Sequence, residues 1–543
     1  MLHIILTILL ITSITIFTIK RHLTYLHIFQ QQEYCNYRFS GWIVSNKIFD
    51  KRLTGTLCLM FIINYFSLKY INLTWHYVLD FAGEYILFIL AILTFAYLEK
   101  DPIKSAKKKL VMTSRANRIY YLSLFVNLIG NLILLFNVHL QNYFIALLLT
   151  IQLIPVYILL ANLLLMPLEK HFQQKFWQEA KQKILSHKPF IIGITGSFGK
   201  TSVKHFLGHI LGQTDHTLIT SGSINTSMGI SRVIREELNT VHKYFIVEMG
   251  AYGVGSINEI CKLTPPNFGI ITAIGAAHYE RFKTLETVAN AKFELAESVI
   301  NNSQDSKCRI VIPEQALNTD YAKQYLQNHK QYFNVLEQKQ LSNVTQLKTG
   351  IAMDLQLDGV IHHIETPIFG LHNVSNICIA FIAAHNLGIP VPTIINALKT
   401  MPQINHRLEV KQQNNCTIID DAYNANPDGF KSGLELLSFL HEPPGRRILV
   451  TPGLIELGEK HHSEHLTLGE LSAKHVDIAI IVNPNRIKSF VSGFKQHTTD
   501  ENKLINVSTF KEAQDWLNIN CQAKDTVLFA NDLPDLYEGG LRI

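Results

Sequence analysis

Long apolar runs dominate the first 166 residues of the chain, and shorter apolar runs alternate with polar segments after them. About 20 helical residues cross the ~30 Å hydrocarbon layer of a bilayer, and each long run has about that length. The pattern predicts an N-terminal multi-span α-helical membrane region over residues 1–166. Its helices, about five in number, are expected at 2–19, 53–71, 78–98, 119–139 and 143–166.

Basic residues gather in two of the segments between these runs. Lys and Arg are frequent in 20–52 and 100–118, whereas the loops "NLTWHY" and "NVHLQN" have neither. The positive-inside rule then puts both basic segments, and everything after Met166, on the cytoplasmic side. We therefore expect a multi-pass protein of the inner (cytoplasmic) membrane, with the lipid bilayer as a partner and its catalytic domains in the cytoplasm. Residues 167–188 are expected to form an amphipathic linker helix.

From residue 189 onwards, short apolar strands alternate with segments of helical periodicity. Strands such as "FIIGITG", "YFIVEMG", "RRILVTPG" and "DIAIIVNP" end in small or polar residues. Such alternation is typical of α/β domains built on parallel sheets. We expect a central ATP-binding P-loop domain at 189–402 and a smaller, Rossmann-like α/β domain at 403–543.

Composition removes some classes of function. The net charge is +6 for 543 residues, and the basic residues form no dominant stripe, so no nucleic-acid partner is expected. The seven cysteines include no CxxC pair, which argues against a disulfide framework or a zinc site. Buried free thiols in a reducing compartment are the expectation.

The stretch "FIIGITGSFGKTSVKHFL" joins a strand, a glycine turn and the start of a helix. The strict pattern G-x-x-x-x-G-K-[ST] fails, because Ile194 stands at its first glycine. Glycines still allow backbone N–H groups to face an anion at a helix N-terminus. Lys200 can reach the β- and γ-phosphates of a nucleotide, and the Thr201 hydroxyl can bind Mg²⁺. The stretch therefore predicts a nucleotide site.

Three further residues follow strands of the same domain. Glu248 ends an apolar strand, where ligands of parallel α/β sheets gather, so it is placed to bind a cation or a water. A surface acid at a strand end is the alternative for Glu248. His278 follows the next strand, and Lys292 lies on the helix after it. Taken singly, such a histidine is usually structural, and such a lysine is usually a solvated charge.

Ordered motifs resemble the Mur ligase family, which makes amide bonds in peptidoglycan precursors. The pieces are TGSFGKTS, VEMGAYG, IGAAHYE, NAKFE, HNVSN, HRLEV, DDAYNANP and TPGLIELG, all between residues 189 and 543. The last two look most like the branch that adds D-alanyl-D-alanine to the muramoyl tripeptide, the MurF type. The resemblance implies ATP and Mg²⁺ as cofactors.

The resemblance also implies a role for individual residues. It implies catalytic roles for Lys200, Glu248, His278 and Lys292. Thr201 and Glu248 would ligate one Mg²⁺, whereas His278 and the carbamate of Lys292 would lie at a second. Asn225 and Thr226 would contact the acid substrate. The resemblance places the adenine of ATP near two asparagines, the ribose near an aspartate and the phosphates near the other residues of the set. The implied ATP-binding residues are Gly196, Ser197, Gly199, Lys200, Thr201, Ser202, Asn373, Asn376, Arg407 and Asp421.

The implied reaction is ATP-dependent ligation through an acyl phosphate, with a muropeptide-type acid and an amine or dipeptide as substrates. No α/β unit for a uridine nucleotide precedes residue 189, so a lipid-linked acid is a further hypothesis. Other cell-wall enzymes are possible partners. Alternatives are a ligase resembling folylpolyglutamate synthase, and a membrane scaffold that keeps the fold without catalysis. An ATP-driven transporter lacks support, because the apolar runs show no charged path.

Overall fold

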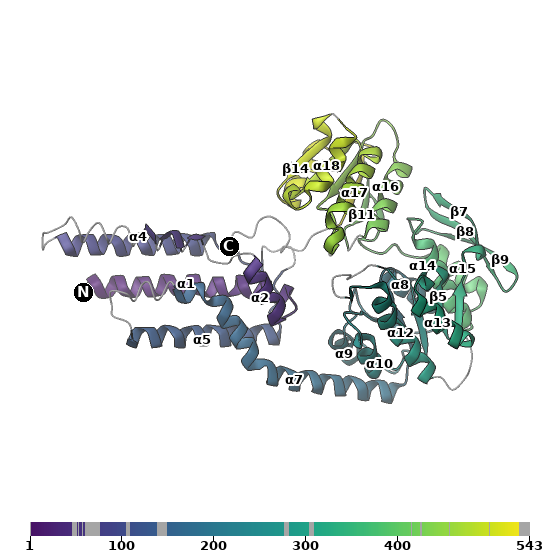
Figure 1. The fold of residues 1–543 in the computed structure, drawn as a ribbon, viewed down its shortest axis with the longest axis horizontal. Coiled ribbons are helices and arrows are strands. Elements are labelled where there is room, and N and C mark those ends of the chain that lie inside the picture. The colour runs from purple at the N-terminus through teal and green to yellow at the C-terminus, as the bar shows by residue number, and fades with distance from the viewer. Residues whose placement is uncertain are drawn as a thin grey trace. The chain divides into compact units, whose positions relative to one another are not determined.

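The structure is a computed structural model. It describes residues 2–45, 51–52, 54–56, 58–59, 76–104, 109–137, 149–275, 282–302, 309–413, 415–423, 426–455, 457–498 and 500–531. The chain divides into two compact units, one built on Met1–Phe172 and the other on Gln173–Asp532. The first is helical, and the second has the α/β character that the strand pattern predicts (Figure 1).

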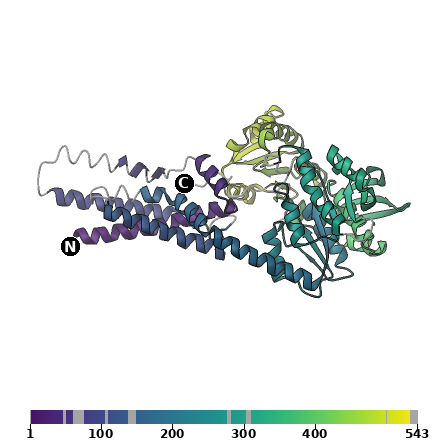
Figure 2. The ribbon, with the colours of Figure 1, turned by 60° about the horizontal axis from the view of Figure 1, so that its bottom comes forward.

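The helices α1 (Leu2–Gln31), α4 (His76–Leu98) and α5 (Ser114–Asn137) of the first unit run alongside one another in Figure 1, and the helices of this unit are seen from another side in Figure 2. Their mutual packing buries apolar side chains from several helices, with Phe17, Phe29, Ile92 and Ile119 each fully inside. Helix α7 continues beyond this unit into the next one. The helices are α1 (Leu2–Gln31), α2 (Asn36–Ser45), α4 (His76–Leu98), α5 (Ser114–Asn137) and α7 (Ile154–His187).

An ion-pair cluster lies inside this helical unit. Arg21 donates to Glu99 across 2.8 Å, and their side chains are only 1% and 4% exposed. Thr24 and Arg52 donate to the same carboxylate at 2.7 and 2.9 Å. Burial alone would raise the pKa of Glu99, but these donors, Arg21 foremost, hold it below its usual value. Each buried charge in the cluster has a partner of opposite charge, which offsets the free-energy cost of burying it.

No helix in this part of the chain, so far as it is described, combines the length and the apolar character that crossing a bilayer requires. On this finding, the prediction of an N-terminal multi-span membrane region over 1–166 is wrong. The multi-pass location in the inner membrane, inferred from it, is contradicted with it. The apolar runs end in polar segments of the same helices: α1 passes through Arg21 to Gln31, and α7 continues past Pro167 into charged residues up to His187. Most of the run expected at 53–71, and residues 143–148 of the run expected at 143–166, lie outside the described residues.

The second unit is organised around a six-stranded parallel sheet with the order β2-β3-β1-β4-β5-β6. Its inner strands are apolar on both faces, as in a sheet covered by helices on both sides. The order reverses at β1, where parallel α/β sheets bind ligands beyond the carboxyl ends of the strands. The strands are β1 (Phe190–Thr195), β2 (Thr217–Ile219), β3 (Tyr244–Glu248), β4 (Phe268–Ile271), β5 (Ile310–Pro313) and β6 (Phe333–Leu336).

Helices cover the two faces of this sheet and form two separate cores. One core joins the sheet to α8 (Lys200–Leu211), α14 (Asn373–Asn386) and α15 (Val391–Lys399), together with a small antiparallel sheet. That sheet is made of β7 (Leu341–Leu347), β8 (Gly350–Leu357) and β9 (Val360–Thr366). The other core lies against α9 (Ser227–Glu236), α10 (Ser256–Leu263), α12 (Leu285–Asn302) and α13 (Asp320–His329).

A second α/β layer follows the segment 400–408. Its six-stranded sheet has the order β10-β11-β15-β12-β13-β14, in which only β10 is antiparallel to its neighbour. The strands are β10 (Glu409–Gln413), β11 (Cys416–Asp421), β12 (Arg447–Thr451), β13 (Ile478–Val482), β14 (Leu504–Val507) and β15 (Thr526–Ala530). The helices are α16 (Pro427–Leu440), α17 (His461–His475), α18 (Lys488–Gln496) and α19 (Phe510–Asn520).

Candidate active site

The glycine turn after β1 folds tightly against two neighbouring elements. Gly199, which precedes α8, has φ +79°, and a Cβ there would clash with the side-chain amide of Asn376. At Gly196 a Cβ would clash with the Thr272 side chain and lie 2.9 Å from the backbone nitrogen of Ala273. Both positions therefore require glycine. No side chain caps the N-terminus of α8, so its first N–H groups face the turn as an anion site would require.

Glu248, at the end of β3, is the hub of the site. Its side chain is 2% exposed, and its Oε2 accepts from the Thr201 hydroxyl at 2.9 Å and from Lys204 Nζ at 3.0 Å. Oε1 accepts from Asn225 Nδ2 at 3.3 Å. Burial alone would raise the pKa of Glu248, but Lys204 and Lys200 hold it below its usual value. The carboxylate is therefore ionised at neutral pH.

Two lysines belong to the same region, of which Lys200 is half-buried and Lys292 is buried. Lys200 Nζ donates to the carbonyl of Gly196 at 2.7 Å, so its ammonium lies along the glycine turn. Burial lowers the pKa of Lys200, and Glu248 partly opposes that shift. Lys292, on α12, is 4% exposed, and its pKa lies well below the usual value because of burial and then the charge of Lys200. Among the described residues no carboxylate contributes to that shift, so the environment favours a neutral amine at Lys292.

The second α/β layer and the segment 400–408 that leads into it contribute three residues to the turn and its surroundings. Arg407 Nη2 donates to the Thr201 hydroxyl at 3.3 Å, and its guanidinium lies 5.2 Å from the centre of the Tyr423 ring. The Tyr423 hydroxyl meets the Ser223 hydroxyl in a short hydrogen bond. Asp421, at the end of β11, accepts from the Leu408 N–H at 3.3 Å. Burial raises the pKa of Asp421 to about 7, although Leu408 and Arg407 act in the opposite direction.

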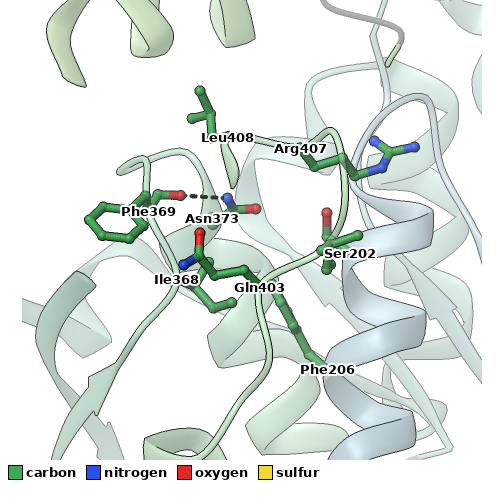
Figure 3. Close-up of a pocket in the computed structure, with 9 residues that line it drawn as sticks. Ser202, Phe206, Ile368, Phe369, Asn373, Gln403, Arg407 and Leu408 are labelled. Atoms are coloured by element: carbon green, nitrogen blue, oxygen red, sulfur yellow. Dashed lines mark hydrogen bonds between the residues drawn. The ribbon is translucent and has the colours of Figure 1, made fainter. Parts of the chain in front are cut away.

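A small pocket with a free volume of about 10 Å³, partly open to solvent, lies beside the glycine turn (Figure 3). Its walls come from α8, from 368–373 at the start of α14 and from 403–408. Apolar side chains cover much of the wall, and Asn373 is fixed in it by a 2.9 Å bond to the Phe369 carbonyl. Asn376 donates in turn to Asn373 Oδ1 at 3.2 Å. The lining residues are Ser202, Phe206, Ile368, Phe369, Asn373, Gln403, Ile404, Arg407 and Leu408.

Most of the residues expected from the sequence gather around this turn, and a few do not take part as expected. Thr201, Glu248, Asn225 and Arg407 are joined by hydrogen bonds. The Ser197 hydroxyl closes the turn by donating to Gly275 O at 3.0 Å. The Thr226 hydroxyl accepts from Gly229 N at 3.3 Å and so caps α9. His278 lies outside the described residues.

Lys204 is the main residue that the sequence analysis missed. It is fully buried and pairs with Glu248 at 3.0 Å. Its position one helical turn after Lys200 was the available signal, since residues four apart share a helix face. Charge alone gave no reason to separate it from a solvated lysine. Phe206, Gln403 and Leu408 in the pocket wall carried no signal of their own.

Two protein-family descriptions match the chain. The Mur ligase middle domain matches residues 194–384, and the Mur ligase glutamate ligase domain matches residues 406–531. Together these two matches span more than half of the chain. They coincide with the two α/β layers of the second unit and leave the helical unit unmatched.

Curated relatives carry one common name, UDP-N-acetylmuramoyl-tripeptide–D-alanyl-D-alanine ligase. The protein of that name from Buchnera aphidicola (subsp. Acyrthosiphon pisum) is 30% identical over 288 residues, which is 52% of this chain and 61% of the relative. The one from Escherichia coli K12 is 28% identical over 324 residues, 58% of this chain and 69% of the relative. The chain thus spans about 61% of the length of the first of these relatives.

Solved structures agree on the fold. Crystal structure II of MurF from Acinetobacter baumannii superposes with a TM-score of 0.58 at 25% identity, covering 66% of this chain and 77% of that one. The MurF ligase from Thermotoga maritima, solved in complex with ADP, gives 0.55 at 22% identity, with 66% and 80% covered. With both family domains present in order on matching α/β layers, the chain belongs to the Mur ligase family.

Proposed function

We propose that this protein is an ATP-dependent ligase that forms an amide bond through an acyl phosphate. The observation that carries the proposal is the convergence of Lys200, Thr201 and Glu248 at the N-terminus of α8, with Arg407 reaching the same hydroxyl from the second layer. Such a set suits a reaction in which negative charge builds on a transferring phosphoryl group.

The residues around the turn fit a bound nucleotide. The glycines leave room for phosphate oxygens next to the backbone, and the uncapped start of α8 offers its N–H groups to them. Lys200, whose described contact is a backbone carbonyl, can exchange that contact for a phosphate oxygen. Asn373 and Asn376 would lie near the adenine, and Asp421 near the ribose.

The same residues fit a magnesium ion. Thr201 and Glu248 offer hard oxygen ligands, of the kind Mg²⁺ prefers, within 2.9 Å of each other. When bound, the ion supplies charge neutralisation for the phosphoryl oxygens. His278 and the carbamate of Lys292 complete the proposed set. A carbamate forms when a neutral amine adds CO₂ and loses a proton, and burial of Lys292 provides the neutral amine.

The chain's part in the reaction is to hold charge in place. A carboxylate oxygen of the acid attacks the γ-phosphorus of ATP, ADP leaves, and an acyl phosphate results. The amine then attacks the acyl carbon, phosphate leaves, and the nitrogen loses a proton. Lys200 and Arg407 would donate hydrogen bonds to phosphate oxygens throughout, and Asn225, fixed by Glu248, would face the acid.

The names of the relatives suggest the substrates. We infer that the acid is the UDP-linked muramoyl tripeptide and that the amine is the D-alanyl-D-alanine dipeptide, which places the reaction in peptidoglycan synthesis. The lipid-linked acid considered from the sequence is not retained, because it was inferred from the predicted membrane region alone.

Mass spectrometry of reaction products tests the proposal directly. Every reaction contains the purified chain, ATP, Mg²⁺ and the UDP-linked tripeptide. The amine added is D-alanyl-D-alanine, D-alanine or L-glutamate, each in a separate reaction. We expect an adduct and stoichiometric ADP only with the dipeptide. Lys200→Ala should lower kcat by roughly 10²–10³ or more, because one preorganised charge donor is lost.

Three outcomes would count against this assignment. ADP release that needs neither acid nor amine would indicate a hydrolase. An adduct with L-glutamate on a different acid would favour a ligase of the folylpolyglutamate type. Binding of ADP without any adduct across the panel would favour a scaffold that keeps the fold without catalysis.

A further inference from the structure

Lys204 lies at a junction that the reaction described above does not use. Its side chain is fully buried on the face of α8 that packs against β3. Its Nζ donates to Glu248 Oε2 at 3.0 Å and makes a short bond to the backbone carbonyl of Gly222. The Lys204 ammonium therefore joins Glu248, at the end of β3, to the loop that contains Gly222.

Gly222 belongs to the loop 220–226, which leads from β2 to α9. Asn225 of the same loop donates to Glu248 Oε1 at 3.3 Å and accepts from the Tyr252 hydroxyl at 2.9 Å. The backbone carbonyl of Asn225 also accepts from Gly250 N at 2.9 Å. The loop is thus attached to Glu248 at two points: through Lys204 on one carboxylate oxygen and through Asn225 on the other.

Of the two attachments to Glu248, the one through Asn225 is the weaker. The bond from Asn225 is long and its donor is a neutral amide, whereas the bond through Lys204 is charge-assisted on the Glu248 side. A lysine also has three donors and no acceptor, so it can serve the carboxylate and the carbonyl at once. A methionine of similar length could fill the space without making either contact.

We propose that Lys204 is a positioning residue that ties the loop 220–226 to the Glu248 carboxylate and so sets the acid-substrate site relative to the nucleotide site. That the loop binds the acid substrate is taken from the proposed function, and this part of the inference rests on it. The tether itself is a property of the folded chain. Loss of Lys204 should release the loop and weaken acid binding, while the glycine turn that holds the nucleotide keeps its own contacts.

Kinetics and hydrogen exchange test this in the full-length protein. In Lys204→Met, KM for the UDP-linked tripeptide should rise about 10- to 100-fold, since hydrogen bonds to charged groups are worth about 1.5–3 kcal/mol. Kd for ADP, measured without Mg²⁺, should change less than about twofold. Peptides covering 220–229 should exchange faster, because the bond from Ile224 N to the Ser221 carbonyl depends on the loop's conformation. Lys204→Arg, which keeps a charged donor, should recover part of the loop's protection.

Lys183 offers a matched control. Its Nζ also donates to a backbone carbonyl, that of Arg235 at 2.8 Å, but it joins α7 to the end of α9 and lies away from the loop. Lys183→Met should leave KM for the acid and exchange in 220–229 unchanged. If Lys204→Met fails to fold, Lys204→Gln, which can still donate to one acceptor, takes its place with the same expected direction.

The outcomes separate the two proposals. Unchanged exchange in 220–229, or a fall in kcat with KM for the acid unaltered, would overturn the tether. A wild-type protein that makes no adduct would overturn the proposed function, while faster exchange in Lys204→Met would still support the tether, because exchange does not depend on turnover.

Discussion

At the scale of single residues, burial shifts the pKa values of Lys292 and Asp421 in opposite directions, and both shifts favour the neutral form of the side chain. It lowers the pKa of Lys292 well below its usual value and raises that of Asp421 to about 7. Desolvation disfavours the charged form of either group. In each case burial favours the neutral form, which is the form that the proposed carbamate at Lys292 needs and from which Asp421 could donate to the proposed ribose hydroxyl.

The shift at Asp421 predicts a pH-dependent stability. Its carboxyl is protonated below about pH 7 in the folded state, but only below about 3.8 in the unfolded state. Between these values the folded state binds more protons, so the free energy of unfolding falls as pH rises. Asp421→Asn cannot ionise and keeps an acceptor for Leu408 N–H. Its Tm relative to wild type, measured without ligand, should therefore increase from pH 5 to pH 8.

The expected gain in Tm of Asp421→Asn over wild type follows from how Tm scales with size. A change of about 1 kcal/mol in the free energy of unfolding shifts Tm by roughly 2–4 °C for a domain of 150–250 residues. Asp428→Asn is a suitable control, since that carboxyl lies in the first turn of α16. A Tm difference for Asp421→Asn that stays constant across this range would show that the carboxyl titrates normally.

At the scale of elements, the glycine turn depends on a helix far away in sequence. α14 presents Asn376 against Gly199, so the conformation of the turn is fixed from outside as well as by its own glycines. α8 and α14 also share one core with β1. The start of α8 is therefore held rigidly, which suits a site that must keep its N–H groups aimed at a phosphate.

Gly199→Ala should damage this element specifically. The φ of +79° is unfavourable for alanine, and the added Cβ would collide with Asn376. We expect a loss of about 1–3 kcal/mol in the free energy of unfolding and a weaker Kd for ADP. Gly253→Ala is the matched control, because its Cβ would meet nothing within 4 Å. Equal effects of the two substitutions would contradict this account of the turn.

The sequence could predict elements whose signals are local, and it failed where distant segments decide. The strand, turn and helix at 190–211 follow from glycine spacing and periodicity, and so do the two α/β layers. Hydropathy of the first 166 residues could indicate helices, but not that Arg21 would pair with Glu99 inside them. Lys204 became part of the site only because β3 pairs with β1 and brings Glu248 beside α8.

At the scale of the whole chain, the two α/β layers belong to one compact unit and meet at the candidate site. Arg407 reaches Thr201, and the ring beneath it, Tyr423, reaches Ser223 of the loop 220–226. One residue pair thus touches the proposed nucleotide side of the site, and the other touches the proposed acid side. We therefore expect the second layer to contribute to both proposed substrate sites, as domains that complete a site on closing do.

A double-mutant cycle on Tyr423 and Ser223 measures this link. Tyr423→Phe removes the hydroxyl but keeps the ring beside Arg407, and Ser223→Ala removes its partner. A hydrogen bond between neutral groups is worth about 0.5–1.5 kcal/mol, so each single variant should lower kcat/KM for the acid by roughly 2- to 10-fold. The double variant should be no worse than either single one, because the same bond is lost each time. Fully multiplicative losses would mean that the two hydroxyls act independently and that the layers communicate only through Arg407 and Thr201.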